Sequence, residues 1–171
     1  GQIAHLRGCR TIGSAGSAAK VALCREIGFD YMFDYHEGNL LNHLREGAPD
    51  GLDVYFDNVG GDHLEAALSH MKHLGRIALC GAISQYNATA PVPGPRNLSV
   101  SIGSGLNLRG FLVGMFPELR EPFQEEMTGW LESDQIVWRE TVLDGIQRAP
   151  EAFIGLFTGV NVGKMLVKLA A

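Results

Sequence analysis

Strand-like and helix-like patterns alternate along the whole chain, and this alternation restricts the fold more than any single motif. Short runs of apolar and β-branched residues predict strands at 9–14, 31–35, 52–60 and 75–81. Helical spacing of apolar residues predicts helices between them at 17–28, 39–47 and 62–73. Strands joined through helices by short loops pair in parallel and are covered on both faces. The sequence therefore predicts an α/β fold with a Rossmann-type, doubly wound parallel sheet.

The second half of the chain continues the pattern after a long loop. Residues 82–97 are rich in Pro, Gly and Asn and predict this loop. The elements expected after it are a strand at 106–113, a helix at 117–133, an extended segment at 136–142, a helix at 149–159 and a strand at 163–169. Pro122 is expected near the first turn of its helix or at a break in it, because proline lacks the N–H that the helix interior needs.

The start of the chain has the pattern of a helix that is already under way. Ile3, Ala4 and Leu6 are apolar, and Gly8 stands where a helix C-cap belongs. The first residue is Gly1, not Met. We therefore expect the front of a longer protein to precede this segment.

Composition excludes several classes of protein. The net charge is −5 and there is no basic run, which argues against a nucleic-acid partner. No apolar run is long enough to span a bilayer and no signal peptide is visible, so no membrane association is expected. The three cysteines include no C-x-x-C pair, which favours a reducing, cytoplasmic setting.

The turn after the first strand lacks negative charge. The stretch TIGSAGSAAK at 11–20 contains no Asp or Glu, and its first charge is Lys20. An acid near such a turn selects NAD by binding the ribose hydroxyls, whereas a helix N-terminus with serines and a cation suits a 2′-phosphate. The turn thus indicates a preference for NADP. The alternative is a simple tight turn followed by a solvated lysine.

Other candidate residues follow the later strands, at the edge where parallel sheets bind ligands. In FDNVGG, Asn58 can offer a donor and an acceptor to a cofactor, or it can form a local Asx-turn unaided. Asp57 has no second carboxylate as a partner, so a catalytic role is discounted. Cys80 is expected as a small core residue rather than a nucleophile. His70 and His73 share a face of the predicted helix, but two ligands do not make a zinc site, and no metal is expected.

Several motifs in fixed order resemble those of a known family. They are GQIAHLRGCR, AGS followed by Lys20, FDNVGG, GRIALCGAISQYNAT, PGPRN, APEAFIGLFTG and NVGK. Together they are similar to the NADP-dependent, zinc-free medium-chain dehydrogenases/reductases, in the group of prostaglandin reductase, leukotriene B4 dehydrogenase and 2-alkenal reductase. The segments FQEEMTGWL and WRETVLDGIQRAPEAFIGLF look closest to the bacterial curcumin reductases.

The resemblance implies a function and a domain organisation. Family members carry hydride from NADPH to the β-carbon of an α,β-unsaturated ketone or aldehyde, and saturate the C=C bond without a metal. It implies an NADP-binding domain at 1–135 and a C-terminal segment at 136–171 that returns to the catalytic domain. The GroES-like domain and the first Rossmann strand with its glycine loop have no counterpart in the sequence. A slot is therefore expected in the sheet between the strands beginning near Cys9 and Leu52. The isolated chain is expected to be inactive, and a homodimer is expected.

The resemblance also assigns residues to the NADP(H) site. Lys20 and Tyr35 match residues that hold the 2′-phosphate and adenosine side, and Ser17 lies beside them. Tyr86 is the candidate catalytic residue, placing the enolate oxygen or organising the nicotinamide ribose. The remaining cofactor-binding candidates are Asn58, Cys80, Gly81, Ala82, Ile83, Ser84, Gln85, Phe111, Leu112, Val113 and Asn161.

Two other functions fit the same residues. A quinone reductase of the same superfamily would share the fold and the cofactor. A non-catalytic NADP-binding or structural protein would keep the fold alone. Because the cofactor performs the hydride chemistry, the lack of paired carboxylates or of a nucleophile does not separate these possibilities.

Overall fold

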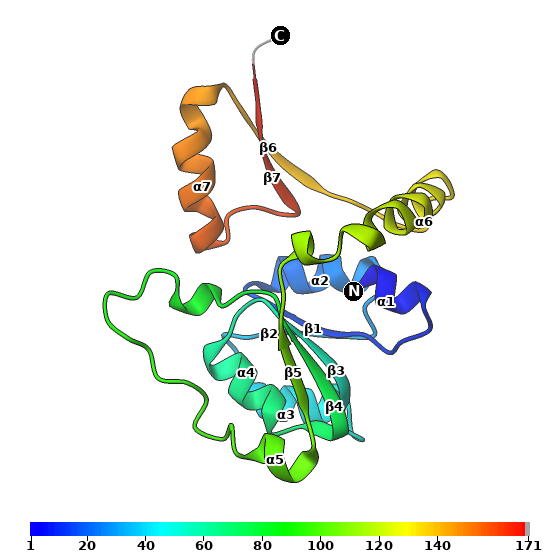
Figure 1. Cartoon of the computed structure of the whole chain (residues 1–171). Helices are drawn as coiled ribbons and strands as arrows, with labels where there is room; N and C mark the ends of the chain where they lie inside the picture. Colours follow the sequence, from blue (N-terminus) through cyan, green and yellow to red (C-terminus); the bar gives the residue numbers. More distant parts are fainter. Residues whose placement is uncertain (170–171) are drawn as a thin grey trace.

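The computed structural model describes residues 1–169 and shows an α/β protein built on parallel strands (Figure 1). Helix α1 (Gln2–Leu6) leads to β1 (Ile12–Ala15), α2 (Ala18–Glu26), β2 (Tyr31–Asp34), α3 (Leu40–Gly47), β3 (Leu52–Asp57), α4 (Gly61–Leu68) and β4 (Met71–Leu79). After the short helices η1 (Ile83–Gln85) and α5 (Val100–Ser104) comes β5 (Asn107–Gly110). The predicted α/β class with parallel strand pairing is confirmed.

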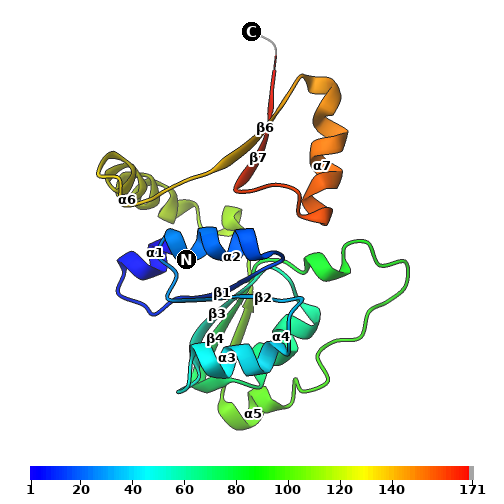
Figure 2. The same ribbon diagram turned by 180° about the vertical axis from the view of Figure 1, so that it is seen from behind.

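The strands form three groups rather than one continuous sheet. Strand β1 pairs with β2, and β3, β4 and β5 pair in that order. In the part of the chain that the structure describes, β1 and β3 are not hydrogen-bonded neighbours. This break between β1 and β3 lies where the sequence predicted a slot in the sheet. In both views α2 lies on one side of these strands, and α3 and α4 lie on the other (Figures 1 and 2).

The third group of strands is a pair near the end of the described chain. Helices η2 (Val113–Met115), η3 (Pro117–Leu119) and α6 (Arg120–Glu132) lead to β6 (Glu140–Asp144), η4 (Ile146–Arg148), α7 (Ala149–Thr158) and β7 (Lys164–Lys168). Strand β6 pairs in parallel with β7, and α7 connects them. This β6–α7–β7 unit lies beyond α2 from the other strands (Figure 2). Pro122 lies in the first turn of α6, as predicted.

Helix caps explain where the early helices begin. The Ser17 hydroxyl accepts a hydrogen bond from the Lys20 N–H at 3.4 Å at the start of α2. Asn39 caps α3 in the same way through the Asn42 N–H, at 3.2 Å. Each side chain satisfies one of the N–H groups that a helix start leaves free. These caps bear out the predicted helix starts.

The prediction of a helix over 62–73 is wrong at its end. Helix α4 stops at Leu68, and β4 begins at Met71. The His70 carbonyl accepts the Leu52 N–H at 2.9 Å, so pairing with β3 overrides local helical propensity. Leu74 then adopts a φ of 60° where the register of the two strands shifts. His70 and His73 therefore do not share a helix face.

The main core lies between the β3–β4 pair and helices α3 and α4. Leu52, Ala48 and Ala67 form a buried cluster, with Leu44 and Met71 packed against it. Met32, Leu68 and Ile77 are nearly inaccessible to solvent. Burial of these side chains supplies the main favourable term for the fold. It also fixes the positions of the carboxyl ends of β3 and β4.

Candidate functional site at the carboxyl ends of the strands

Asp57 organises the turn that follows β3. Its side chain is 1% exposed, and its Oδ1 accepts the N–H groups of Val59 and Gly60, both at 2.9 Å. The Tyr55 hydroxyl donates to the same oxygen at 3.1 Å. Burial, with Asp57 adding to the effect, raises the pKa of Tyr55, so that its hydroxyl remains a donor at all ordinary pH values. The Asp57 side chain thus holds the turn after β3 in place.

The turn after β3 holds the loop that follows β4. The Asp57 carbonyl accepts the N–H groups of Cys80 at 2.8 Å and Gly81 at 3.0 Å. The Asn58 carbonyl accepts the Ile83 N–H at 3.1 Å, and the Ser84 hydroxyl donates to the Val59 carbonyl at 2.6 Å. Asn58 itself is exposed. The structure thus brings Asn58 and residues 80–86 together, as the sequence predicted.

The Tyr86 side chain forms a hydrogen bond within the loop at 80–86. Its hydroxyl oxygen accepts the Ala82 N–H at 3.2 Å, and its side chain is 61% exposed. A pocket of about 340 Å³ lies beside it, lined by Asp57, Gly60, Leu64, Leu79, Cys80, Gly81, Ala82, Gln85 and Tyr86. Since the Ala82 contact uses the oxygen as an acceptor, the hydroxyl hydrogen remains available to a ligand. Cys80 is exposed, so the expectation that it lies in the core is wrong.

Residues 111–113 extend the site past the end of β5. The Phe111 N–H donates to the Leu79 carbonyl at 3.2 Å, next to Cys80. The Phe111 ring packs edge-on against Phe56, with centroids 5.8 Å apart. Leu112 and Val113 are 66% and 87% exposed. An exposed apolar surface therefore adjoins the loop at 80–86.

Ser17, Lys20 and Tyr35 form a second group of candidates at the start of α2. A Cβ atom at position 16 would lie 2.7 Å from the Tyr35 hydroxyl oxygen, so glycine there lets the ring reach the turn beside Ser17. The Tyr35 ring also packs edge-on against His63 of α4, with centroids 5.3 Å apart. Burial lowers the pKa of His63. The contact between Tyr35 and His63 joins the end of β2 to α4. The sequence contained no signal that pointed to His63.

Lys20 and Asn161 each contact the segment after α7. The Lys20 ammonium donates to the Gly159 carbonyl at 2.6 Å. Asn161 donates from its side-chain amide to the Gly163 carbonyl at 2.7 Å and lines a pocket of about 430 Å³ between α7 and β7. Asn161 thus lies on the same turn as Gly159, which binds Lys20. Among residues 1–169, no hydrogen bond joins Asn161 to the loop at 80–86.

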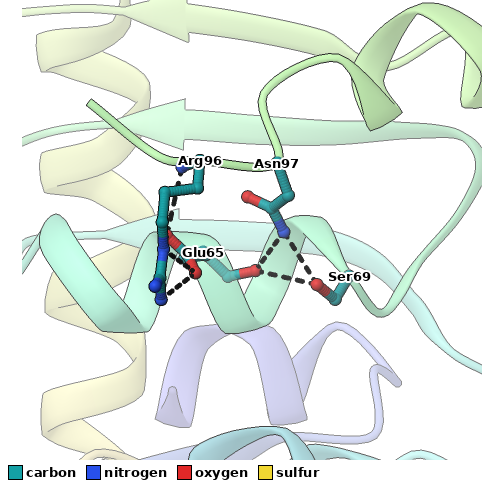
Figure 3. A network of polar contacts seen from close by, with 4 residues as sticks. All are labelled: Glu65, Ser69, Arg96 and Asn97. Atoms are coloured by element: carbon teal, nitrogen blue, oxygen red, sulfur yellow. Dashed lines mark hydrogen bonds and ion pairs between the residues drawn. The ribbon is translucent and has the colours of Figure 1, made fainter. Parts of the chain in front are cut away.

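A polar network attaches the long loop after η1 to α4 (Figure 3). The Arg96 guanidinium donates to both oxygens of Glu65, with the shortest contact at 2.7 Å, and the Arg96 N–H adds another at 3.1 Å. Asn97 donates to the Glu65 carbonyl at 2.8 Å and to the Ser69 hydroxyl at 2.7 Å. The sequence predicted the loop but gave no sign of this attachment.

Removing the charge of Glu65 is expected to loosen the loop. Hydrogen bonds from Arg96 lower the pKa of Glu65, so the attachment is complete above the ordinary pKa of a glutamate. It is lost as the pH falls through the lowered value. Glu65→Gln should therefore increase severalfold the rate at which trypsin cleaves after Arg96 at neutral pH, because charge-assisted bonds are the stronger ones.

Glu151→Gln is the matched control for that experiment. Glu151 of α7 also binds a guanidinium through both oxygens, but its partner Arg148 lies only three residues earlier in the chain, at the end of η4. Its loss should leave cleavage after Arg96 unchanged. Equal cleavage rates in Glu65→Gln and the unaltered protein would show that the network does not hold the loop.

The described residues contain neither a metal-binding cluster nor a membrane-spanning helix. Among residues 1–169, no group of three or more His, Cys, Asp or Glu side chains is placed to hold a metal ion. His70 instead contacts the Ala48 carbonyl through Nε2 at 2.7 Å. No helix of this described part is both long and apolar enough to cross a membrane.

Known proteins are similar to this chain in sequence. Residues 1–133 match the family described as zinc-binding dehydrogenase. Prostaglandin reductase 1 of Mus musculus is 44% identical over 170 residues, or 98% of this chain and 52% of the relative. The NADPH-dependent curcumin reductase of Escherichia coli (strain K12) is 39% identical over 176 residues, or 99% of this chain and 51% of the relative. The chain thus spans about half the length of these relatives.

A solved structure agrees with the fold over the whole chain. The crystal structure of CurA from Vibrio vulnificus in complex with NADPH matches with a TM-score of 0.93 and 37% identity, covering 100% of this chain and 52% of CurA. The resemblance to prostaglandin, curcumin and 2-alkenal reductases that the motifs predicted is confirmed. The chain belongs to the zinc-binding dehydrogenase family.

Proposed function

We propose that this chain is the cofactor-binding part of an NADPH-dependent reductase that saturates the C=C bond of α,β-unsaturated ketones and aldehydes. The observation that carries the proposal is the likeness, over all of this chain, to CurA bound to NADPH. The names of two relatives support it: one is an NADPH-dependent curcumin reductase and another is a 2-alkenal reductase (NADP(+)-dependent), which is 42% identical over 172 residues.

The residues at the strand ends fit the two ends of such a cofactor. Ser17, Lys20 and Tyr35 surround the start of α2, where a helix N-terminus and a cation suit a phosphate. Within residues 1–169, no carboxylate lies within ion-pair distance of Lys20. Asn58, residues 80–86 and residues 111–113 would then lie along the ribose and nicotinamide, and Asn161 near the cofactor from the C-terminal side.

Tyr86 is the residue proposed to act on the substrate. When bound, NADPH would supply a hydride for the β-carbon of the enone, and a proton taken up at the α-carbon would complete the saturation of the C=C bond. The Tyr86 hydroxyl would donate its free hydrogen to the oxygen on which negative charge develops, or to the ribose that positions the ring. Because the Ala82 contact already fixes the Tyr86 hydroxyl, this hydroxyl could stabilise the charge without first changing its position.

Tyr86→Phe is expected to lower kcat by roughly a hundredfold to a thousandfold, as for the loss of one oxyanion donor, and to change the NADPH affinity less. Steady-state kinetics with an enone and a separate NADPH titration measure the two effects. Tyr31→Phe is the control, because the Tyr31 hydroxyl contacts His43 and Glu46 away from this edge. An unchanged kcat in Tyr86→Phe would remove the tyrosine from the chemistry.

An assay with protein of native length tests the function itself. The proposal predicts that NADPH is oxidised as the conjugated C=C bond of an enone is lost, with a saturated ketone as the product. Turnover of quinones without turnover of enones would identify a quinone reductase. Cofactor binding with neither activity would support the non-catalytic alternative. That the isolated chain is inactive stays a prediction, as does a cytoplasmic location.

We infer a boundary near residue 135 between the cofactor-binding domain and the C-terminal segment at 136–171. Strands β6 and β7 pair only with one another among the described strands, which supports this division. We also propose a homodimer. Strand β5 is an edge of the β3–β4–β5 group, and an edge strand offers unpaired backbone groups to a second copy. Sedimentation of the native-length protein tests this.

A further inference from the structure

The turn after α7 holds the Lys20 side chain. Gly159 caps α7 with a φ of 67°, and its carbonyl accepts the Lys20 ammonium at 2.6 Å. The last carbonyls of a helix carry partial negative charge, so a cation is favoured there. The two residues are 139 positions apart in the chain, yet α7 ends near the start of α2 in both views (Figures 1 and 2).

This contact leaves most of the ammonium free for a ligand. A lysine ammonium has three donors, and the Gly159 carbonyl uses one of them. Because no carboxylate of the described residues pairs with Lys20, the positive charge is not neutralised. A free lysine side chain loses rotamer entropy when a ligand binds it, whereas one already held at its tip loses less.

We propose that Gly159 is a positioning residue that fixes the Lys20 ammonium for the 2′-phosphate of the cofactor. The proposal rests on the proposed NADPH site, and it makes the turn after α7 part of the specificity for NADP over NAD. Two features favour glycine at this position. The φ of 67° disfavours other residues, and a Cβ atom at 159 would lie 3.2 Å from the Lys20 Nζ.

Two variants of Gly159 test the proposal. Gly159→Ala adds a Cβ beside the ammonium. Gly159→Asn adds the same Cβ, but asparagine tolerates the left-handed conformation. The Gly159→Asn protein should therefore fold even if Gly159→Ala does not. The probes are 2′,5′-ADP and 5′-AMP, which differ by the 2′-phosphate alone, with affinities measured by calorimetry on protein of native length. Gly105→Ala is the control, because Gly105 caps α5 with a φ of 59° and does not contact Lys20.

Both Gly159 variants should bind 2′,5′-ADP roughly threefold to tenfold more weakly, the cost of ordering one long side chain, and 5′-AMP as before. Gly105→Ala should change neither affinity. If Lys20→Ala loses the preference for 2′,5′-ADP while the Gly159 variants keep it, or if the Gly159 variants weaken both probes equally, the positioning role is overturned. If Lys20→Ala and the unaltered protein show the same preference, the proposed phosphate site itself fails.

Discussion

Lys20→Ala is expected to raise the KM for NADPH by about tenfold to a hundredfold and to leave the KM for NADH almost unchanged. The range corresponds to about 1–3 kcal/mol for a lost charge-assisted contact. The effect is selective because NADPH and NADH differ only in the 2′-phosphate that the ammonium is proposed to bind. Steady-state kinetics with both cofactors at saturating enone measure it.

Lys72→Ala is the control for that experiment. Lys72 is a surface lysine whose ammonium contacts Asp53 at 2.8 Å, near the opposite end of β3 from the site. Its loss should alter neither KM. A similar rise of the KM for both cofactors in Lys20→Ala would indicate a general defect of the site and contradict the phosphate-binding role.

Asp57→Ala is expected to destabilise the protein by about 3 kcal/mol. Three donors lose their acceptor, namely the Val59 and Gly60 N–H groups and the Tyr55 hydroxyl. Each buried donor left without a partner costs about 1–3 kcal/mol. The second carboxylate oxygen, Oδ2, is buried and has no hydrogen-bond partner among residues 1–169, so its removal offsets part of the loss. Urea denaturation measures the change in the free energy of unfolding.

Asp53→Ala is the matched control on the same strand. The Asp53 side chain is 73% exposed and makes a surface ion pair, which contributes little to stability. Its free energy of unfolding should stay within about 0.5 kcal/mol of the unaltered protein. If Asp57→Ala were as mild as Asp53→Ala, the turn after β3 would not depend on this carboxylate.

The sequence predicted the elements whose signals are local. Strand β2 and helices α2 and α3 follow apolar periodicity and capping residues such as Ser17 and Asn39, which act within a few positions. The end of α4 was predicted wrongly because Met71 pairs with Leu52, a contact between separate elements. Local propensity cannot report such a pairing.

The same distinction applies to the candidate site. Asn58 and Tyr86 each follow a predicted strand. Because ligands bind beyond the carboxyl ends of parallel strands, the sequence predicted that both residues lie at one edge of the sheet. The contacts of Lys20 with Gly159, Tyr35 with His63 and Arg96 with Glu65 join distant positions. A single sequence carries no signal for these pairs. The residue assignments to the cofactor remain predictions that rest on the family resemblance.

The fate of the hydride tests the proposed function most directly. Protein of native length would be given NADPH that carries deuterium at both C4 positions of the nicotinamide, together with an α,β-unsaturated ketone, and the product would be analysed by NMR. The account predicts a saturated ketone with deuterium on its β-carbon. Deuterium on the carbinol carbon of an unsaturated alcohol, or a saturated ketone without deuterium, would contradict it.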